Sequence, residues 1–155
     1  MKQTIANHVE GLQKLIFFSQ PIPIREQNMV DNTIVHFDIP ATDLEKMKTF
    51  YSKLFNWKIY RAPGPVDYWM IETVPVDEQG MPVRPGVNGG MYKKEQPELK
   101  SVNYILVENI EESIQKIKTL GGTITQQKQE VPGVGWIASA FDPEGNPFAV
   151  LQSMR

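Results

Sequence analysis

A pattern of one strand, one helix and three further strands occurs twice along this chain of 155 residues. The first copy opens with "TIVHFDIPATDLEKMKTFYSKLF" from Thr33, and the second opens with "SVNYILVENIEESIQKIKTLGG" from Ser101. In both copies a segment of alternating polarity precedes apolar residues spaced three and four apart, which marks the change from strand to helix. The sequence therefore predicts an α+β fold with two tandem βαβββ modules, at about residues 33–97 and 101–153.

The helix boundaries are predicted from capping signals. We expect the first helix to open at a capping box of Thr42 and Glu45, and the second at Asn109 with Glu112. The spacing predicts buried stripes of Leu44, Met47, Tyr51 and Leu54 in the first helix and Ile110, Ile114 and Ile117 in the second. Residues on or beside the first stripe are also expected in the core, namely Phe50, Phe55 and Trp57. Three strand-like runs follow each helix, starting near Trp57, Asp67 and Val87, then near Thr123, Gly135 and Pro147.

Residues 1–28 differ from the repeated part of the chain. Four apolar residues share one helical stripe: Ile5, Val9, Leu12 and Ile16. The segment "PIPIREQ" from Pro21 ends that helix, because proline lacks the amide hydrogen. We therefore expect a helical arm and linker at 1–28 and a folded domain at 29–155, with Met29 as an alternative start. Two roles for the arm stay open: it lies on its own domain, or it crosses to the second subunit of a homodimer.

Charge and composition exclude several classes of partner. Sixteen basic and 18 acidic residues give a net charge of -2. There is no long run of like charge, so no nucleic-acid partner is expected. The chain has no cysteine, which rules out disulfides and cysteine-bound zinc and suits the cytoplasm. The apolar run at 15–18 is too short to span a membrane, so we expect a cytoplasmic protein.

The two modules, the opening "HFDIPATDLEKMKTFYSKLFNWK" and the closing "FDPEGNPFAVLQ" together resemble the vicinal oxygen chelate superfamily, the glyoxalase and bleomycin-resistance group. The resemblance extends from Thr33 to Gln152. It implies that the modules curl into a cup of mixed sheet with the helices outside, and that ligands project inward from the modules' first and last strands. The superfamily includes isomerases, epimerases, dioxygenases, transferases and metal-free drug-binding proteins, so the resemblance does not specify an activity.

The resemblance places a first metal ligand at His36. Alternation along the opening strand puts Ile34, His36 and Asp38 on one face and Val35, Phe37 and Ile39 on the other. With the apolar set toward the helix, His36 points into the cup, and its counterpart in the second module is Tyr104. Metal-dependent relatives have a glutamate in the last strand where this chain has Ala149. A divalent ion needs three or four protein ligands, so we expect no cofactor, and metal-dependent glyoxalase activity is disfavoured.

The expected lining of the cup favours a small-molecule-binding or sequestering protein over an enzyme. A planar, partly aromatic ligand would stack on its aromatic side chains, with tyrosine hydroxyls and His36 as orienting groups. The predicted lining residues are His36, Asp38, Tyr68, Met70, Glu72, Tyr104, Trp136 and Ala149. One alternative is a lyase, isomerase or dioxygenase with one divalent metal ion in an altered site of His36, Asp38 and Glu72. Another is a protein with a closed cup that acts through its surface.

Overall fold

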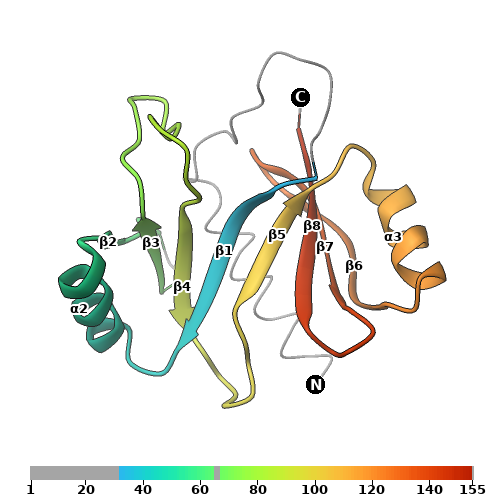
Figure 1. The fold of residues 1–155 in the computed structure, drawn as a ribbon, viewed down its shortest axis with the longest axis horizontal. Coiled ribbons are helices and arrows are strands. Elements are labelled where there is room, and N and C mark those ends of the chain that lie inside the picture. The colour runs from blue at the N-terminus through green and yellow to red at the C-terminus, as the bar shows by residue number, and fades with distance from the viewer. Residues whose placement is uncertain (1–31, 65–66, 155) are drawn as a thin grey trace.

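The computed structural model describes residues 32–64 and 67–154, so the predicted arm and Met29 lie outside the described residues. The first module consists of β1 (Ile34–Ala41), α2 (Leu44–Phe55), β2 (Lys58–Arg61), β3 (Tyr68–Glu72) and β4 (Gly89–Lys93). The second consists of β5 (Val102–Leu106), α3 (Ile110–Thr119), β6 (Thr123–Val131), β7 (Gly135–Phe141) and β8 (Pro147–Ser153) (Figure 1). The prediction of two tandem βαβββ modules in an α+β fold is confirmed.

The strands of the described residues form a single mixed sheet in the order β2-β3-β4-β1-β5-β8-β7-β6. Strand β1 is parallel to β4, β5 is parallel to β8, and the antiparallel β1–β5 pair joins the two modules. Helices α2 and α3 lie at opposite ends of this sheet (Figure 1). We call the helix-bearing side of the sheet the outer face and the opposite side the inner face. None of the described helices is long and apolar enough to cross a membrane.

Side-chain alternation divides the core between the two faces of the sheet. Beneath α2, the outer face has a buried cluster of Leu44, Ile59, Trp69, Ile71 and Met91. Beneath α3, it has a cluster of Val107, Ile110, Ile114, Ala138 and Val150. The inner face has a third cluster, which includes Tyr68, Tyr92, Tyr104, Ile137, Ala149 and Leu151. The inner cluster thus brings three tyrosine hydroxyls into the core, and these need hydrogen-bond partners.

The N-caps agree with the prediction in α3 and differ by one residue in α2. In α3, the side-chain oxygen of Asn109 accepts from the Glu112 amide at 3.1 Å, as predicted. In α2 the N-cap is Asp43 rather than Thr42, and its carboxylate accepts from the Lys46 amide at 2.9 Å. An aspartate is favoured here because its negative charge also interacts with the positive end of the helix dipole.

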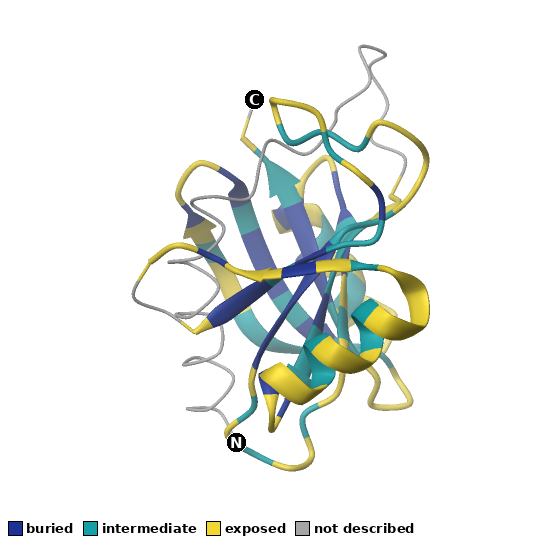
Figure 2. Ribbon diagram, turned by 90° about the vertical axis from the view of Figure 1, so that its left-hand side faces the viewer, coloured by how far each residue is buried: buried dark blue, intermediate teal, exposed yellow. Residues whose placement is uncertain are grey.

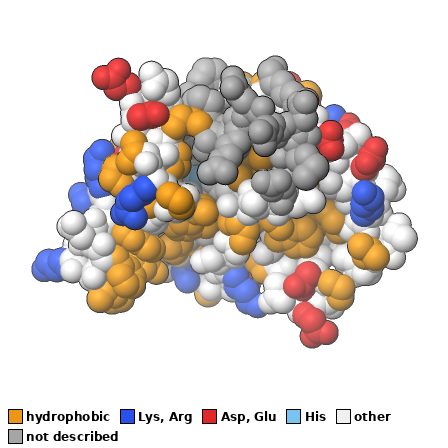
Figure 3. All heavy atoms as spheres, turned by 45° about the horizontal axis from the view of Figure 1, so that its top comes forward, with side chains coloured by type: hydrophobic (Ala, Val, Ile, Leu, Met, Phe, Trp, Pro, Cys, Tyr) orange, Lys and Arg blue, Asp and Glu red, His pale blue; other side chains and the backbone are white. Residues whose placement is uncertain are grey.

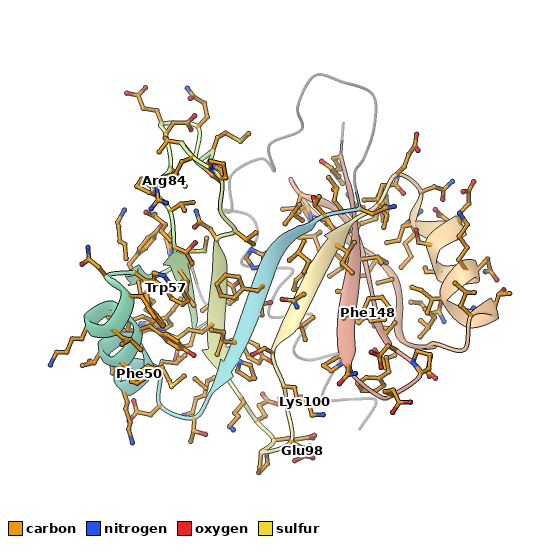
Figure 4. The ribbon with its side chains drawn as sticks, in the orientation of Figure 1. Phe50, Trp57, Arg84, Glu98, Lys100 and Phe148 are labelled. Carbon is orange, nitrogen blue, oxygen red and sulfur yellow. The ribbon has the colours of Figure 1, made fainter. Side chains whose placement is uncertain are left out.

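The buried stripe of α2 is narrower than predicted. Phe50, Leu54 and Phe55 are 55%, 56% and 53% exposed, so the prediction that they belong to the core is wrong. Trp57 does pack into the outer cluster, where its ring stacks on Tyr51 at a centroid distance of 5.1 Å. Figure 4 shows Phe50 and Trp57 at the α2 end of the molecule, and Figure 2 shows the exposed side of α2. A helix on one sheet buries only the stripe that faces it, so the flanking residues stay exposed.

A β-bulge in β1 changes which of its first residues face inward. The register pairs Ile34 with Ile105 and His36 with Tyr104, so β1 has one extra residue between them. Val35 packs against the inner cluster, whereas the partner of Ile34, Ile105, packs against the α3 cluster. The predicted faces of Ile34 and Val35 are therefore wrong. Beyond the bulge the predicted alternation is confirmed, with Phe37 in the outer cluster.

Gly90 leaves the space that Tyr68 needs to cross β4. It is paired with Asp38 of β1 on one side and Met70 of β3 on the other. A Cβ atom on residue 90 would overlap the Tyr68 hydroxyl oxygen. We predict that Gly90→Ala lowers the free energy of unfolding by about 1–3 kcal/mol in urea denaturation, because the ring must move.

A double-mutant cycle provides the control for this prediction. In a Tyr68→Ala background the ring is gone, so Gly90→Ala should have a much smaller effect on stability. An equal loss in both backgrounds would contradict the steric account.

Candidate functional site

Asp38 lies in the middle of β1 and is completely buried on the inner face. Its carboxylate accepts a hydrogen bond from the Tyr68 hydroxyl at 2.6 Å and another from the Tyr104 hydroxyl at 3.0 Å. Tyr68 belongs to β3 and Tyr104 to β5, so the two donors approach from opposite sides of β1. Burying a carboxylate is costly unless it is hydrogen-bonded, and the tyrosines offset that cost.

His36 extends this network toward solvent. Its Nε2 atom lies 2.9 Å from the Tyr68 hydroxyl oxygen and 3.3 Å from Oδ1 of Asp38. Its ring meets the ring of Tyr104 edge to face, with centroids 5.5 Å apart. The Tyr68 hydroxyl donates its hydrogen bond to Asp38, so the Tyr68 oxygen can accept a hydrogen bond from the Nε2–H group of His36. We assign that tautomer, which leaves Nδ1 as an acceptor on a side chain that is 17% exposed.

The tyrosines of the inner face remain protonated donors. Burial, and then the negative charge of Asp38, raise the pKa values of Tyr68 and Tyr104 well above 10.0. The same two causes raise the pKa of Tyr92 on β4. Tyr92 and Gly90 were not predicted as site residues. Their spacing in "GGMYKK" could have identified them, since residues two apart in a strand share a face and Met91 faces outward.

Two further predicted residues lie on the inner face. Met70 is partly exposed and packs against the inner cluster. Ala149 is completely buried and is paired with Tyr104 in the β5–β8 register. The structure thus brings these residues together with His36, Asp38 and Tyr68.

Glu72 and Trp136 are engaged elsewhere. The carboxylate of Glu72 binds Lys58 Nζ at 3.1 Å and accepts from the Tyr60 hydroxyl at 2.7 Å, at the β2 edge of the sheet. Burial and Glu72 raise the pKa of Tyr60 to about 12. Trp136 packs against the α3 cluster, with Lys128 Nζ 4.4 Å from its ring centroid. The prediction that Trp136 lines the cup is wrong, because alternation along β7 turns its neighbour Ile137 inward instead.

The inner face does not supply the donor set of a divalent metal centre. Within residues 32–64 and 67–154, no group of three His, Cys, Asp or Glu side chains could hold a metal ion. Nε2 of His36 and both oxygens of Asp38 are engaged with the tyrosines. Ala149 has no donor atom, and burial keeps Tyr104 protonated. The residues present therefore do not fit the three-ligand centre that zinc enzymes use.

Comparisons with known proteins agree with this architecture. A model of the Glyoxalase/Bleomycin resistance protein/Dioxygenase superfamily matches residues 33–150. A glyoxylase-like domain-containing protein of Didymella fabae is 30% identical over an alignment of 122 residues, and the match covers 73% of this chain and 88% of that protein.

Two solved structures share the fold at low sequence identity. A hypothetical protein of Bacillus halodurans C-125 is 16% identical with a TM-score of 0.57, over 81% of this chain and 96% of that one. A Streptomyces coelicolor methylmalonyl-CoA epimerase in complex with 2-nitronate-propionyl-CoA is 12% identical with a TM-score of 0.55. That match covers 79% of this chain and 97% of the epimerase.

Removing either hydroxyl that binds Asp38 should destabilise the fold. We predict that Tyr68→Phe and Tyr104→Phe each lower the free energy of unfolding by about 1.5–3 kcal/mol, as expected for a hydrogen bond to a buried charge. The matched control is Tyr60→Phe, which removes an exposed tyrosine–carboxylate bond and should cost less than about 1 kcal/mol. Equal losses in the three variants, measured by urea denaturation, would contradict a special role for Asp38.

The same tyrosines should make the protein sensitive to alkali. An unfolded tyrosine ionises near pH 10, whereas folded Tyr68 and Tyr104 keep their protons to higher pH. Their contribution to stability is therefore complete below about pH 10 and falls as pH rises further. Each of the two tyrosines should make the free energy of unfolding fall by up to about 1.4 kcal/mol more per pH unit. A plot of that free energy against pH, between about pH 10 and 11, should therefore be shallower for the double variant Tyr68→Phe/Tyr104→Phe than for the wild type. Identical slopes for the two proteins would contradict the raised pKa values of these tyrosines.

Proposed function

We propose that this chain, which belongs to the Glyoxalase/Bleomycin resistance protein/Dioxygenase superfamily, binds or sequesters a small organic molecule on its inner face without a metal ion. The observation that carries the proposal is the network of His36, Tyr68, Asp38 and Tyr104 within an apolar cluster. Few, well-placed polar groups in an apolar and aromatic lining are typical of small-molecule sites.

The chemistry of the inner face favours a flat, largely apolar ligand that carries a hydrogen-bond donor. His36, Met70 and Val35 are partly exposed there, so they offer the first contacts to a ligand. The bare Nδ1 of His36 can accept from an N–H or O–H group, and Met70 and Val35 can contact an apolar ring. The Asp38 carboxylate has a different task, because it holds the tyrosines and His36 in place.

The proposed site contains no metal ion because the inner face offers too few side chains that could bind one. In the metal-dependent proteins that this chain resembles, a glutamate occupies the position of Ala149. Here that position borders Tyr104, which itself takes the place of a ligand. The altered site of His36, Asp38 and Glu72 is not favoured either, since Glu72 is bound to Lys58 and Tyr60.

The second candidate is an enzyme of the same superfamily that transfers a proton. The observation that favours it is the 3.3 Å contact between Nε2 of His36 and Oδ1 of Asp38. A carboxylate that orients an imidazole is a common arrangement for a general base. In such an enzyme Nδ1 of His36 would take the proton from the substrate, and His36→Ala would abolish turnover.

A thermal-shift screen of small aromatic compounds and antibiotics tests binding directly. A compound present at 100 times its Kd should stabilise the native state by about 2.7 kcal/mol and raise the Tm. His36→Ala should lose this shift, whereas Glu72→Gln, outside the network, should keep it. A shift that survives His36→Ala and disappears in Glu72→Gln would place the ligand elsewhere.

Metal analysis tests the absence of an ion separately. Protein purified without chelator should contain no stoichiometric metal, and titration with nickel, zinc, manganese and iron(II) should show no tight binding. Stoichiometric binding that is lost on His36→Ala would overturn the metal-free proposal.

A further inference from the structure

Five side chains form a continuous row across the inner face, which we call the inner row. The register of the sheet pairs each member with the next, in the order His36 of β1, Tyr104 of β5, Ala149 of β8, Ser139 of β7 and Gln126 of β6. Residues that are paired on neighbouring strands point to the same face of a sheet. The inner row therefore begins at the histidine of the proposed ligand site and ends at Gln126 on the edge strand β6.

Side-chain contacts show that Gln126 points to the inner face, although the β6–β7 register shifts on both sides of it. Nε2 of Gln126 donates a hydrogen bond to the side-chain oxygen of Gln129. Gln129 is paired with Ile137, which belongs to the inner cluster. Lys128 extends to the opposite face instead, where its ammonium lies over the ring of Trp136. The two glutamines therefore share the inner face.

The side-chain oxygen of Gln126 is a buried acceptor without a donor. Within residues 32–64 and 67–154, Oε1 of Gln126 is the only buried side-chain nitrogen or oxygen atom that has no hydrogen-bond partner. An unpaired buried polar group lowers stability, so such groups are rare in native proteins and need an explanation. The place of Gln126 on the same row as His36 suggests one: the missing donor belongs to a ligand.

The equivalent edge of the first module is satisfied by the chain itself. Strands β2 and β6 each follow the helix of their module and form the two edges of the sheet. At the β2 edge, the Glu72 carboxylate accepts from the Tyr60 hydroxyl at 2.7 Å and from Lys58 Nζ at 3.1 Å. The unpaired acceptor is thus a feature of the second module, and it makes the two ends of the inner face chemically different.

The inner row contains no carboxylate, ammonium or guanidinium group. Figure 3 shows lysine, arginine, aspartate and glutamate side chains around the margin of the molecule, with hydrophobic side chains between them. Asp38, which lies beside the row, already accepts from Tyr68 and Tyr104. A neutral donor therefore suits Gln126 better than a cation, because burying a charge requires an opposite charge to offset it.

We propose that Gln126 is a second anchor for the ligand, and that the ligand is an elongated neutral molecule with an N–H or O–H donor at each end. One donor binds Nδ1 of His36 and the other binds Oε1 of Gln126. Four strand spacings of about 4.8 Å separate these residues, so the ligand spans at most about 19 Å. Gln126 and Ser139 are partly exposed, and the terminal torsion of glutamine is soft, so the amide can turn toward the ligand. This inference rests on the proposed function, since it specifies the ligand of the same face.

Binding of three matched stilbenes to the full chain tests the second anchor. The probes are 4,4′-dihydroxystilbene, 4-hydroxystilbene and 4,4′-dimethoxystilbene, which share a flat core and differ in their donors. In calorimetric titrations the dihydroxy compound should bind about tenfold more tightly than the monohydroxy compound, as one added hydrogen bond predicts. Gln126→Met should abolish this advantage and leave the affinity for 4-hydroxystilbene unchanged. The control Gln127→Met changes an exposed glutamine of the same strand and should retain the advantage.

The outcomes separate this inference from the proposed function. Equal affinities for the dihydroxy and monohydroxy compounds, with binding that is lost in His36→Ala, would overturn the second anchor and leave the proposed function standing. Equal affinities for the dihydroxy and dimethoxy compounds would overturn the assignment of Gln126 as an acceptor. If none of the three compounds binds the wild type, both the inference and the proposed function are contradicted.

The stability of the ligand-free protein gives a test that needs no ligand. The double variant Gln126→Met/Gln129→Met keeps the length of both side chains and removes the unpaired acceptor, so the Tm should stay the same or rise. If an ordered water already completes the Gln126 amide, the same variant removes satisfied hydrogen bonds and the Tm should fall. A Tm several degrees below those of the wild type and of Gln127→Met would therefore contradict the inference.

Discussion

The buried carboxylate of Asp38 is the constraint on which the inner face depends. It lies on the first strand of the chain's first module and must be hydrogen-bonded to be tolerated there. One donor, Tyr68, reaches it by crossing β4 above Gly90, and the other, Tyr104, comes from the second module. The network therefore links β3 and β5 to β1 across the junction of the modules, and it specifies the local register of the sheet.

This network also accounts for how the chain departs from the metal-dependent proteins that it resembles. The position of one expected ligand is Tyr104, which donates to Asp38 instead of binding a cation. The neighbouring position, Ala149, is paired with Tyr104 in the β5–β8 register and supplies no carboxylate. His36 is retained, but its Nε2 is engaged with Tyr68. The side chains at these positions are thus engaged with one another, which is the basis for proposing an organic ligand and not a divalent ion.

Much of the fold was predictable because it depends on local periodicity. Strand alternation, helix spacing and the Asn109 cap depend on neighbours in the chain and were predicted correctly. The inner position of His36 followed from the same alternation. The hydrogen bonds from Tyr68 and Tyr104 to one carboxylate join residues 30 and 66 positions apart, and no local pattern contains that information.

The errors have physical causes that a local pattern does not reveal. In β7 both faces are apolar, so only packing decides that Ile137 turns inward and Trp136 outward. In β1 the bulge before His36 exchanges the faces of the first residues. In α2 a single sheet buries one stripe, which leaves Phe50 and Leu54 on the exposed flank.

Nitrogen-15 NMR of the imidazole side chains tests the central claim most directly. The chain has two histidines, so His36→Ala assigns both sets of signals. If the Tyr68–Asp38 network holds His36 as described, Nε2 carries a proton at neutral pH, and its signals do not change when zinc or nickel is added. A bare Nε2, or signals that shift in proportion to added metal, would contradict the account.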